Sequence, residues 1–264
     1  MLRCPNCASP LNRTDREMIC PNGHRFDISK EGYVNLLVTH STKVHGDEPR
    51  MVVARRTFLA QGHYQPLLKA VLNTLDSLKI TSLVDLGCGE GAYTNAIAQT
   101  GINVIGIDLS KAALKRAAKG SSATYVIANL TKTPLIDRSV DAALSIFSPF
   151  DSSEVLRITK RWFIVVRPLP EHLHEFKAVL YETVRPNPMP SDELPGLTLS
   201  TRTIVRFPMD LSANSLQALL DMTPYVHTSP QTSLERLRAL PNLTVTAAFV
   251  LDVFESCTPD ANPL

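Results

Sequence analysis

The feature that most constrains the fold is an alternation of short apolar segments with helical segments, which begins at residue 82. Such an alternation is typical of a parallel sheet whose strands are joined by crossover helices. We expect strands at 82–86, 103–108, 125–128, 141–146 and 162–166, with helices at 92–99 and 110–119. The sequence therefore predicts an α/β fold built on a Rossmann-like, mostly parallel sheet.

The segments on either side of this alternation complete the expected fold. Proline is concentrated at 186–195, where we expect a connection and not a helix. Beyond it, 203–207 and 243–254 are strand-like and would add an antiparallel edge pair, with a helix near 215–222 between them. Two helices are expected ahead of the sheet, and they cover 49–61, with Asp47 as N-cap, and 66–78.

Three of the five cysteines form a metal-ligand pattern with one histidine near the start of the chain. The spacing is C-x2-C-x12-C-x3-H, and the residues are Cys4, Cys7, Cys20 and His24. This spacing places two ligands on each of two tight turns, which can converge on one tetrahedral ion. Because all four positions are filled, we predict one structural Zn²⁺ per chain. The alternative is three free cysteines beside an unrelated histidine.

Zinc would also explain how the first 37 residues fold, since they are rich in turns and short of apolar periodicity. A segment of this kind cannot build a sufficient core of its own. A structural zinc ion contributes roughly 10–16 kcal/mol of apparent binding free energy in peptides, which is enough to order such a segment.

A strand that runs into a glycine-rich turn and then a helix indicates a cofactor site, because glycines let the backbone approach a ligand closely. Gly87, Gly89 and Ala92 satisfy the dinucleotide pattern G-x-G-x-x-A, and Asp108 lies about where an acid that binds a ribose would follow. By this pattern alone a nicotinamide cofactor stays open.

Two details of the turn favour S-adenosylmethionine, which carries a sulfonium and no pyrophosphate. Asp85 places a carboxylate where a cationic ligand is stabilised and a pyrophosphate is repelled. Gly91 extends the turn to G-x-G-x-G and opens space for the methionine portion. Asp108 can accept both ribose hydroxyls of either cofactor. Asn129 either contacts the adenine or caps its own loop, and Glu90 either binds the donor or caps the next helix.

Charge and hydropathy limit the partners. The 27 basic and 25 acidic residues give a net charge of +2, which is too small for nucleic-acid binding by bulk charge alone. Any RNA must therefore be held locally. No apolar run approaches the length of a membrane span, and the first residues lack the apolar core of a signal peptide. We expect a cytoplasmic protein without a membrane partner.

Several longer strings resemble those of one family. They are KEGYVNLL at 30–37, ARR at 54–56, GHYQP at 62–66, HL at 172–173 and MTP at 222–224. With the metal pattern and the glycine turn, they resemble the bacterial guanine-N1 methyltransferases of 23S ribosomal RNA, the ribosomal RNA large subunit methyltransferase A family. The first and third strings are far more specific than the glycine turn, which many methyltransferases share.

The resemblance implies a class I methyltransferase sheet behind an N-terminal zinc module, and methylation of N1 of a guanine in a hairpin of 23S rRNA. It implies that the methyl donor contacts Tyr64, Gly89, Glu90 and His172. Together with the residues of the turn, the candidate donor site is Tyr64, Asp85, Gly87, Gly89, Glu90, Asp108 and His172. The expected division is a zinc-binding RNA-recognition module at 1–37, a helical linker contributing to the cofactor site at 38–80, and the methyltransferase domain at 81–264.

Several questions stay open at this level. Lys160-Arg161 replaces the Pro-Gly-Gly turn that is usual in the family, so the target guanine is not identified. A homodimer is a candidate assembly, and the oligomeric state stays open. No catalytic base is assigned, because the acids near the turn are already given to ligand binding. The competing functions are a small-molecule or protein methyltransferase, a non-catalytic RNA-binding module that retains the fold, and a nicotinamide oxidoreductase. Basic residues for an RNA are Arg3, Arg13, Arg16, Arg25, Lys30, Arg50, Arg55 and Arg56.

Overall fold

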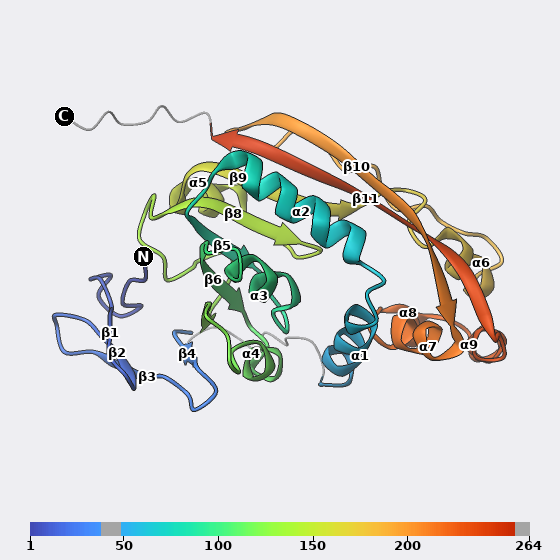
Figure 1. The fold of residues 1–264 in the computed structure, drawn as a ribbon, viewed down its shortest axis with the longest axis horizontal. Helices are drawn as coiled ribbons and strands as arrows, with labels where there is room; N and C mark the ends of the chain where they lie inside the picture. The colour runs from blue at the N-terminus through green and yellow to red at the C-terminus, as the bar shows by residue number, and fades with distance from the viewer. Residues whose placement is uncertain (38–48, 257–264) are drawn as a thin grey trace.

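The computed structural model describes residues 1–37 and 49–256, so the predicted N-cap Asp47 lies outside the described residues (Figure 1). An eight-stranded sheet has the order β10-β11-β9-β8-β5-β6-β7-β4. Its strands are β4 (Tyr33–Asn35), β5 (Ser82–Leu86), β6 (Asn103–Asp108), β7 (Thr124–Ile127), β8 (Val140–Ile146), β9 (Thr159–Pro168), β10 (Leu197–Ser212) and β11 (Asn242–Ser256). The strands from β9 to β4 pair in parallel, whereas β9, β11 and β10 pair antiparallel. The predicted fold class is confirmed.

Helices join and flank these strands. They are α1 (Pro49–Ala60), α2 (Gln65–Leu78), α3 (Ala92–Ala98), α4 (Lys111–Ala117), α5 (Ser152–Ile158), α6 (His174–Leu180), α7 (Ala213–Asp221), α8 (Tyr225–Thr228) and α9 (Gln231–Arg238). The sequence predicted α1 to α4 and α7 to within a few residues, and it missed α5, α6, α8 and α9. Each missed helix has eight residues or fewer, so it is too short to show a clear helical period. The helices α3 and α4 are equally short, but a glycine just beyond each of them, Gly101 or Gly120, marked where they end.

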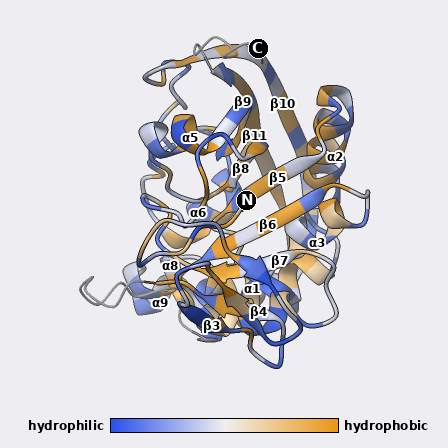
Figure 2. Ribbon diagram, turned by 90° about the vertical axis from the view of Figure 1, so that its left-hand side faces the viewer, coloured by the Kyte–Doolittle hydropathy of each residue, from blue (hydrophilic) through white to orange (hydrophobic). Residues whose placement is uncertain are grey.

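Both faces of the sheet are covered, and for this reason β5 is buried along its whole length. On one face Leu83 shares a hydrophobic core with Leu67 of α2 and Ile97 of α3. On the other face Val84 shares a second core with Val155 of α5. Figure 2 shows β5 and β6 as largely hydrophobic strands through the middle of the molecule.

The N-terminal segment forms a small antiparallel sheet of β1 (Asn12–Arg13), β2 (Glu17–Ile19) and β3 (Arg25–Asp27). It is attached to the loop after β7 and to the edge of the large sheet. Leu2 forms a bridge with Leu135, and β4 lies parallel to β7 at the edge of the large sheet, with Tyr33 opposite Tyr125. The small sheet is therefore fixed against the carboxyl-terminal end of β7 and the loop that follows it.

The edge pair is much longer than the sequence predicted, since β10 covers 16 residues where only 203–207 was expected. Most of its side chains are exposed, because β10 has a neighbour on one side only. An edge strand of this kind carries polar residues on its solvent side, and these hide its length from a hydrophobic pattern. The hairpin of β10 and β11 carries α7, α8 and α9 at its far end, and α7 packs against α1 (Figure 1).

Candidate functional site

A cavity of about 300 Å³ lies at the carboxyl ends of β5, β6 and β8. Six of the seven candidate donor residues line it, and they are Tyr64, Asp85, Gly87, Gly89, Glu90 and Asp108. Crevices at this edge of an open parallel sheet are the usual ligand sites of doubly wound folds, and the volume is within the range of small-molecule sites.

The glycines of the turn are required by their surroundings. Gly87 and Gly91 both have a φ of 79°, a left-handed conformation that side chains disfavour. A Cβ on Gly87 would lie 1.9 Å from Ser148 Oγ, and one on Gly91 would lie 2.4 Å from Tyr125 Oη. The bare backbone therefore lets the β5–α3 turn lie directly against the loop after β8 at Gly87 and against Tyr125 of β7 at Gly91.

Asp108 holds this turn in place. Its carboxylate accepts hydrogen bonds from the backbone N–H of Gly89 at 2.9 Å and from that of Ser110 at 2.7 Å. Because Asp108 also lines the cavity at the end of β6, its carboxylate lies where a ribose beside the turn would meet it. The predicted ribose contact stays a prediction that this geometry supports.

Asp85 supplies a buried carboxylate at the floor of the cavity. It is 3% exposed and accepts a hydrogen bond of 2.6 Å from Thr94 Oγ1. Burial raises the pKa of Asp85 to about 7, although the bond from Thr94 works in the opposite direction. A buried carboxylate is stabilised by a nearby cation, so the site fits a ligand that carries positive charge.

Tyr64 lies at the wall of the cavity, and His172 lies behind Tyr64. Tyr64 lines the cavity, and its ring meets Phe249 edge-on at a centroid distance of 5.1 Å. His172 is not among the residues that line the cavity. Its ring lies 6.5 Å from that of Tyr64, and its Nδ1 accepts from the N–H of Ala248 at 3.2 Å. Burial lowers the pKa of His172 to about 3, so the ring is neutral and supports Tyr64 from behind. A direct contact of His172 with the donor stays a prediction.

Asn129 caps its own loop, which is the second of its two expected roles. Its Oδ1 accepts from the backbone N–H of Thr131 at 2.9 Å and from the Thr131 hydroxyl at 3.0 Å. The neighbouring Leu130 lines the cavity instead. The apolar side chain of Leu130 can pack against the flat face of an adenine, but it cannot hydrogen-bond to the polar edge.

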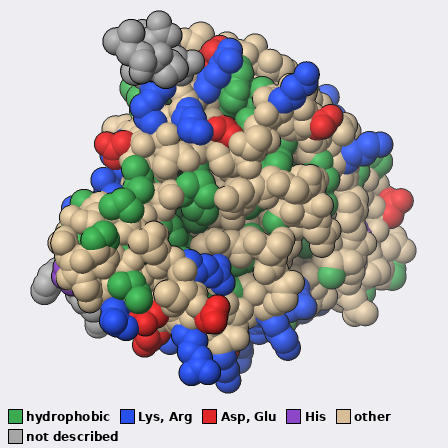
Figure 3. All heavy atoms as spheres, turned by 60° about the vertical axis from the view of Figure 1, so that its left-hand side comes forward, with side chains coloured by type: hydrophobic (Ala, Val, Ile, Leu, Met, Phe, Trp, Pro, Cys, Tyr) green, Lys and Arg blue, Asp and Glu red, His purple; other side chains and the backbone are tan. Residues whose placement is uncertain are grey.

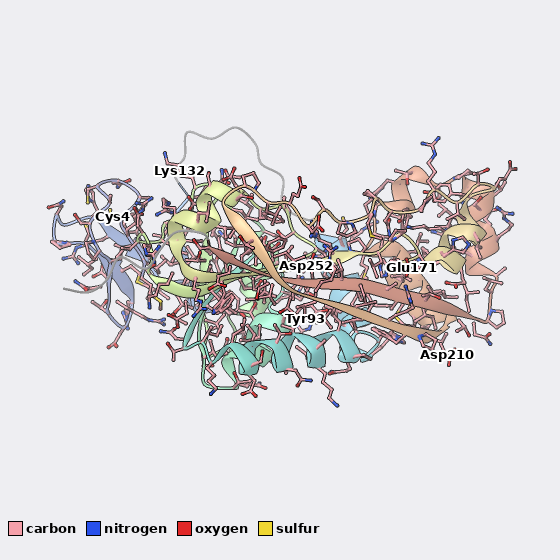
Figure 4. The ribbon with its side chains drawn as sticks, turned by 90° about the horizontal axis from the view of Figure 1, so that it is seen from above. Cys4, Tyr93, Lys132, Glu171, Asp210 and Asp252 are labelled. Atoms are coloured by element: carbon pink, nitrogen blue, oxygen red, sulfur yellow. The ribbon has the colours of Figure 1, made fainter. Side chains whose placement is uncertain are left out.

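Sequence reasoning about individual side chains missed a further set of cavity residues. They are Arg55, Tyr93, Phe147, Ser148, Pro149 and Met222. Arg55 and Met222 belong to strings that carried the family resemblance, so that resemblance was the signal that could have found them. Arg55 of α1 reaches the turn, since a guanidinium nitrogen lies 3.7 Å from the position of a Cβ on Gly89, and Met222 directly follows α7, which packs on α1. Figure 4 shows Tyr93 in the middle of the molecule, with Cys4 toward one end and Asp210 at the other.

The four predicted zinc ligands come together. One ligand atom from each of Cys4, Cys7, Cys20 and His24 lies within 4.8 Å of all the others. His24 Nδ1 is 3.6 Å from Cys4 Sγ and 3.3 Å from Cys20 Sγ, and Cys7 Sγ is 3.7 Å from Cys20 Sγ. Ligands about 2.0–2.3 Å from a tetrahedral zinc ion are separated by distances of this size. The cluster fits a closed structural zinc site, with three thiolates and one imidazole.

The comparisons with known proteins agree with this geometry. Residues 2–43 match the zinc-ribbon family described as "RlmA, N-terminal", and residues 84–169 match the family described as "Methyltransferase domain". A protein of Micromonospora griseorubida, with the provisional name 23S rRNA (guanine-N(1)-)-methyltransferase, is 32% identical across 94% of each chain. This chain belongs to the RlmA-type family of 23S rRNA guanine-N1 methyltransferases.

Two other relatives extend the comparison of this RlmA-type chain. The 23S rRNA (guanine(748)-N(1))-methyltransferase of Streptomyces fradiae is 37% identical over 184 residues, which are 66% of this chain and 65% of that protein. YxjB of Bacillus subtilis is 29% identical over 93% of this chain and 94% of its own. The methyltransferase domain confirms S-adenosylmethionine over a nicotinamide cofactor, and the RlmA zinc ribbon confirms structural zinc.

The length and hydropathy of the described helices decide whether any of them resembles a membrane-spanning helix. In the ranges 1–37 and 49–256, none of them combines the length and the hydropathy that crossing a bilayer requires.

Proposed function

We propose that this chain transfers a methyl group from S-adenosylmethionine to N1 of a guanine in a hairpin of 23S rRNA. The observation that carries the proposal is the combination, in one chain, of an RlmA zinc ribbon and a methyltransferase domain with a relative that matches over 94% of both lengths. Because the substrate is ribosomal RNA, we also propose that the protein acts in the cytoplasm.

The residues that line the cavity divide the work of holding the donor. When bound, S-adenosylmethionine supplies an electrophilic methyl group on a positively charged sulfur. We assign the ribose hydroxyls to Asp108 and the positive charge to Asp85, with Gly87 and Gly89 allowing close approach to the backbone. Tyr64 and Glu90 complete the part of the proposed site that lines the cavity, and His172 stays a predicted donor contact. The contribution of the protein to the rate is then mainly position and orientation.

No side chain is assigned as a general base for the N1 proton. Asp85 and Asp108 already have structural roles, since Asp85 accepts from Thr94 and Asp108 accepts from the turn, and Glu90 is assigned to the donor. Water can take the N1 proton once the target guanine is in place. The role of the protein is therefore to select and hold the guanine.

The RNA is held locally, as the small net charge requires. Figure 3 shows Lys and Arg side chains, with a few Asp and Glu among them, mainly in the upper and lower parts of one face, with hydrophobic side chains between them. A second cavity, of about 470 Å³, lies between the zinc segment and the loop after β7, and Arg3 and Lys132 line it. We propose that residues 1–37 form an RNA-recognition module, residues 38–80 a linker that contributes to the donor site, and residues 81–264 the catalytic domain.

The test is to map the methylated base. The purified chain is incubated with S-adenosylmethionine and ribosomal RNA from cells that lack it, and reverse transcription is expected to stop at one guanine of 23S rRNA. The stop arises because a methyl group on N1 blocks base pairing. RNA binding without a stop would instead indicate a non-catalytic module. Methyl transfer only to a protein or a small molecule would overturn the proposed substrate.

A further inference from the structure

Phe147 has a conformation that its own chemistry disfavours. It follows β8 with a φ of 57°, and a bulky residue in this left-handed region is a genuine outlier. Its large apolar side chain is also 46% exposed, although the ring lines the donor cavity. Strain of this kind persists only where the surroundings impose it, and it is concentrated at functional sites.

The surroundings do impose it. The backbone N–H of Phe147 donates to the carbonyl of Val166 on β9 at 3.2 Å. On β8, the hydroxyl of the fully buried Ser145 donates to the carbonyl of Ser148, in the loop that follows, at 2.9 Å. The ring of Phe147 lies 5.2 Å from that of Phe249 and 6.2 Å from that of Tyr64, measured between centroids. One side of the ring is thus supported by other aromatic rings, and much of the rest faces solvent.

The strand order places Phe147 on the side of the cavity away from the proposed ribose contact. Along the edge of the sheet, β6 ends at Asp108, β5 ends just before the glycine turn, and β8 ends just before Phe147. A donor whose ribose lies at Asp108 and whose methionine portion lies over the turn therefore has its transferable group between β5 and β8. The loop at 147–149 borders the remaining space.

We propose that Phe147 is the platform on which the extruded target guanine stacks, so that its N1 is presented to the donor. This inference rests on the proposed function. Taking a base out of a hairpin costs a few kcal/mol, and stacking on an aromatic side chain is a common way in which proteins recover that cost. The strained backbone keeps the ring exposed over the cavity, where a relaxed loop would let it turn into the core.

The test compares Phe147→Ala with Phe147→Tyr, using the full-length zinc-loaded protein and ribosomal RNA that lacks the modification. Stacking on one aromatic ring is worth about 1–3 kcal/mol per base, so Phe147→Ala is expected to lower kcat/KM for RNA by roughly 5- to 150-fold. Phe147→Tyr keeps the ring and is expected to stay within about threefold of wild type. Because Phe147 borders the donor cavity, donor affinity measured by calorimetry is expected to fall far less than kcat/KM in Phe147→Ala.

Ile204→Ala is the matched control, because Ile204 is 49% exposed but lies on the outer strand β10, outside the cavity lining. It is expected to methylate RNA at the wild-type rate. If the wild-type protein methylates the RNA and Phe147→Ala is fully active, the proposal that the guanine stacks on Phe147 is overturned. An equal loss of donor affinity and kcat/KM would overturn it too, by assigning Phe147 to the donor. Absence of methylation by wild type would instead refute the proposed function.

Discussion

Replacing Asp85 with asparagine is expected to stabilise the donor-free protein at alkaline pH and to weaken donor binding at the same time. Asparagine has the same shape and can still accept the hydrogen bond that Thr94 donates to Asp85 at 2.6 Å. What it removes is the buried negative charge. The two effects have opposite signs because the charge is costly to bury but is needed to attract a cationic ligand.

The magnitude follows from the pKa of Asp85, which burial raises from 3.8 to about 7. A group whose pKa is raised on folding stabilises the protein fully below its unfolded pKa and loses that contribution as the pH rises through the folded value. Three pKa units correspond to about 4 kcal/mol at about 1.36 kcal/mol per unit. Asp85→Asn is therefore expected to raise Tm at pH 8 by roughly 8–16 °C, and to raise it far less near pH 4.

Donor binding is expected to respond in the opposite direction. Loss of an interaction with a charged group costs about 1.5–3 kcal/mol, so Asp85→Asn is expected to weaken donor affinity by roughly 10- to 150-fold. If only the ionised form of Asp85 binds, wild-type affinity falls about tenfold between pH 8 and pH 6, and the variant shows no such dependence. Calorimetry at several pH values measures both effects.

Asp141→Asn is the matched control, because its expected effect on Tm at pH 8 is opposite to that of Asp85→Asn. Burial works against ionisation of Asp141, but hydrogen bonds from Lys160 and Thr81 outweigh it and hold the pKa of this carboxyl below its ordinary value. Its contribution to stability is therefore present above the unfolded pKa and lost as the pH falls. Asp141→Asn is expected to lower Tm at pH 8 and to matter less near pH 3. If Asp85→Asn also lowered Tm at pH 8, the assignment of a costly buried charge would be wrong.

Three further predictions concern the turn, the metal and the ribose contact. Gly87→Ala places a Cβ 1.9 Å from Ser148 Oγ, and Gly120→Ala, the control, places one in open space at a similar φ of 72°. The control is expected to lower the free energy of unfolding by about 1–2 kcal/mol through its backbone conformation. Gly87→Ala is expected to lower it by about 1–3 kcal/mol more because of the clash. Urea unfolding measures this difference, and equal losses would contradict the described contact. Cys20→Ser is expected to loosen the zinc segment and abolish RNA methylation while calorimetry finds donor binding largely intact; an equal loss of donor affinity would argue against separate modules. Asp108→Ala is expected to weaken donor binding through lost hydrogen bonds, and unchanged affinity by calorimetry would exclude its ribose role.

Much of the donor site could be predicted because its residues follow one another along the chain. The β5 strand, its glycine turn and the acid at the end of β6 are local features, and their spacing alone brings Asp85, Gly89 and Asp108 to one edge of the sheet. The zinc cluster was predictable for the same reason, since four ligands on two tight turns need little else to converge.

The remainder of the site depends on contacts between distant segments. Arg55 and Met222 reach the same cavity only because α1 packs against α7, which is carried by the β10–β11 hairpin. His172 lies behind Tyr64 because Phe249 of β11 packs against both rings. The spacing of residues along the chain does not show such long-range contacts. A sequence pattern therefore could not distinguish a residue that lines the cavity from one that packs behind it.

The sequence by itself determined the class of sheet, the metal ligands and the glycine turn, because short-range spacing and backbone geometry control each of them. Only the tertiary structure decided that β4 closes the edge beside β7, that β10 extends over 16 residues, and that Phe147 is held exposed over the cavity. These outcomes depend on the burial of apolar surface and the pairing of strand edges between segments far apart in the chain, and both are properties of the folded whole.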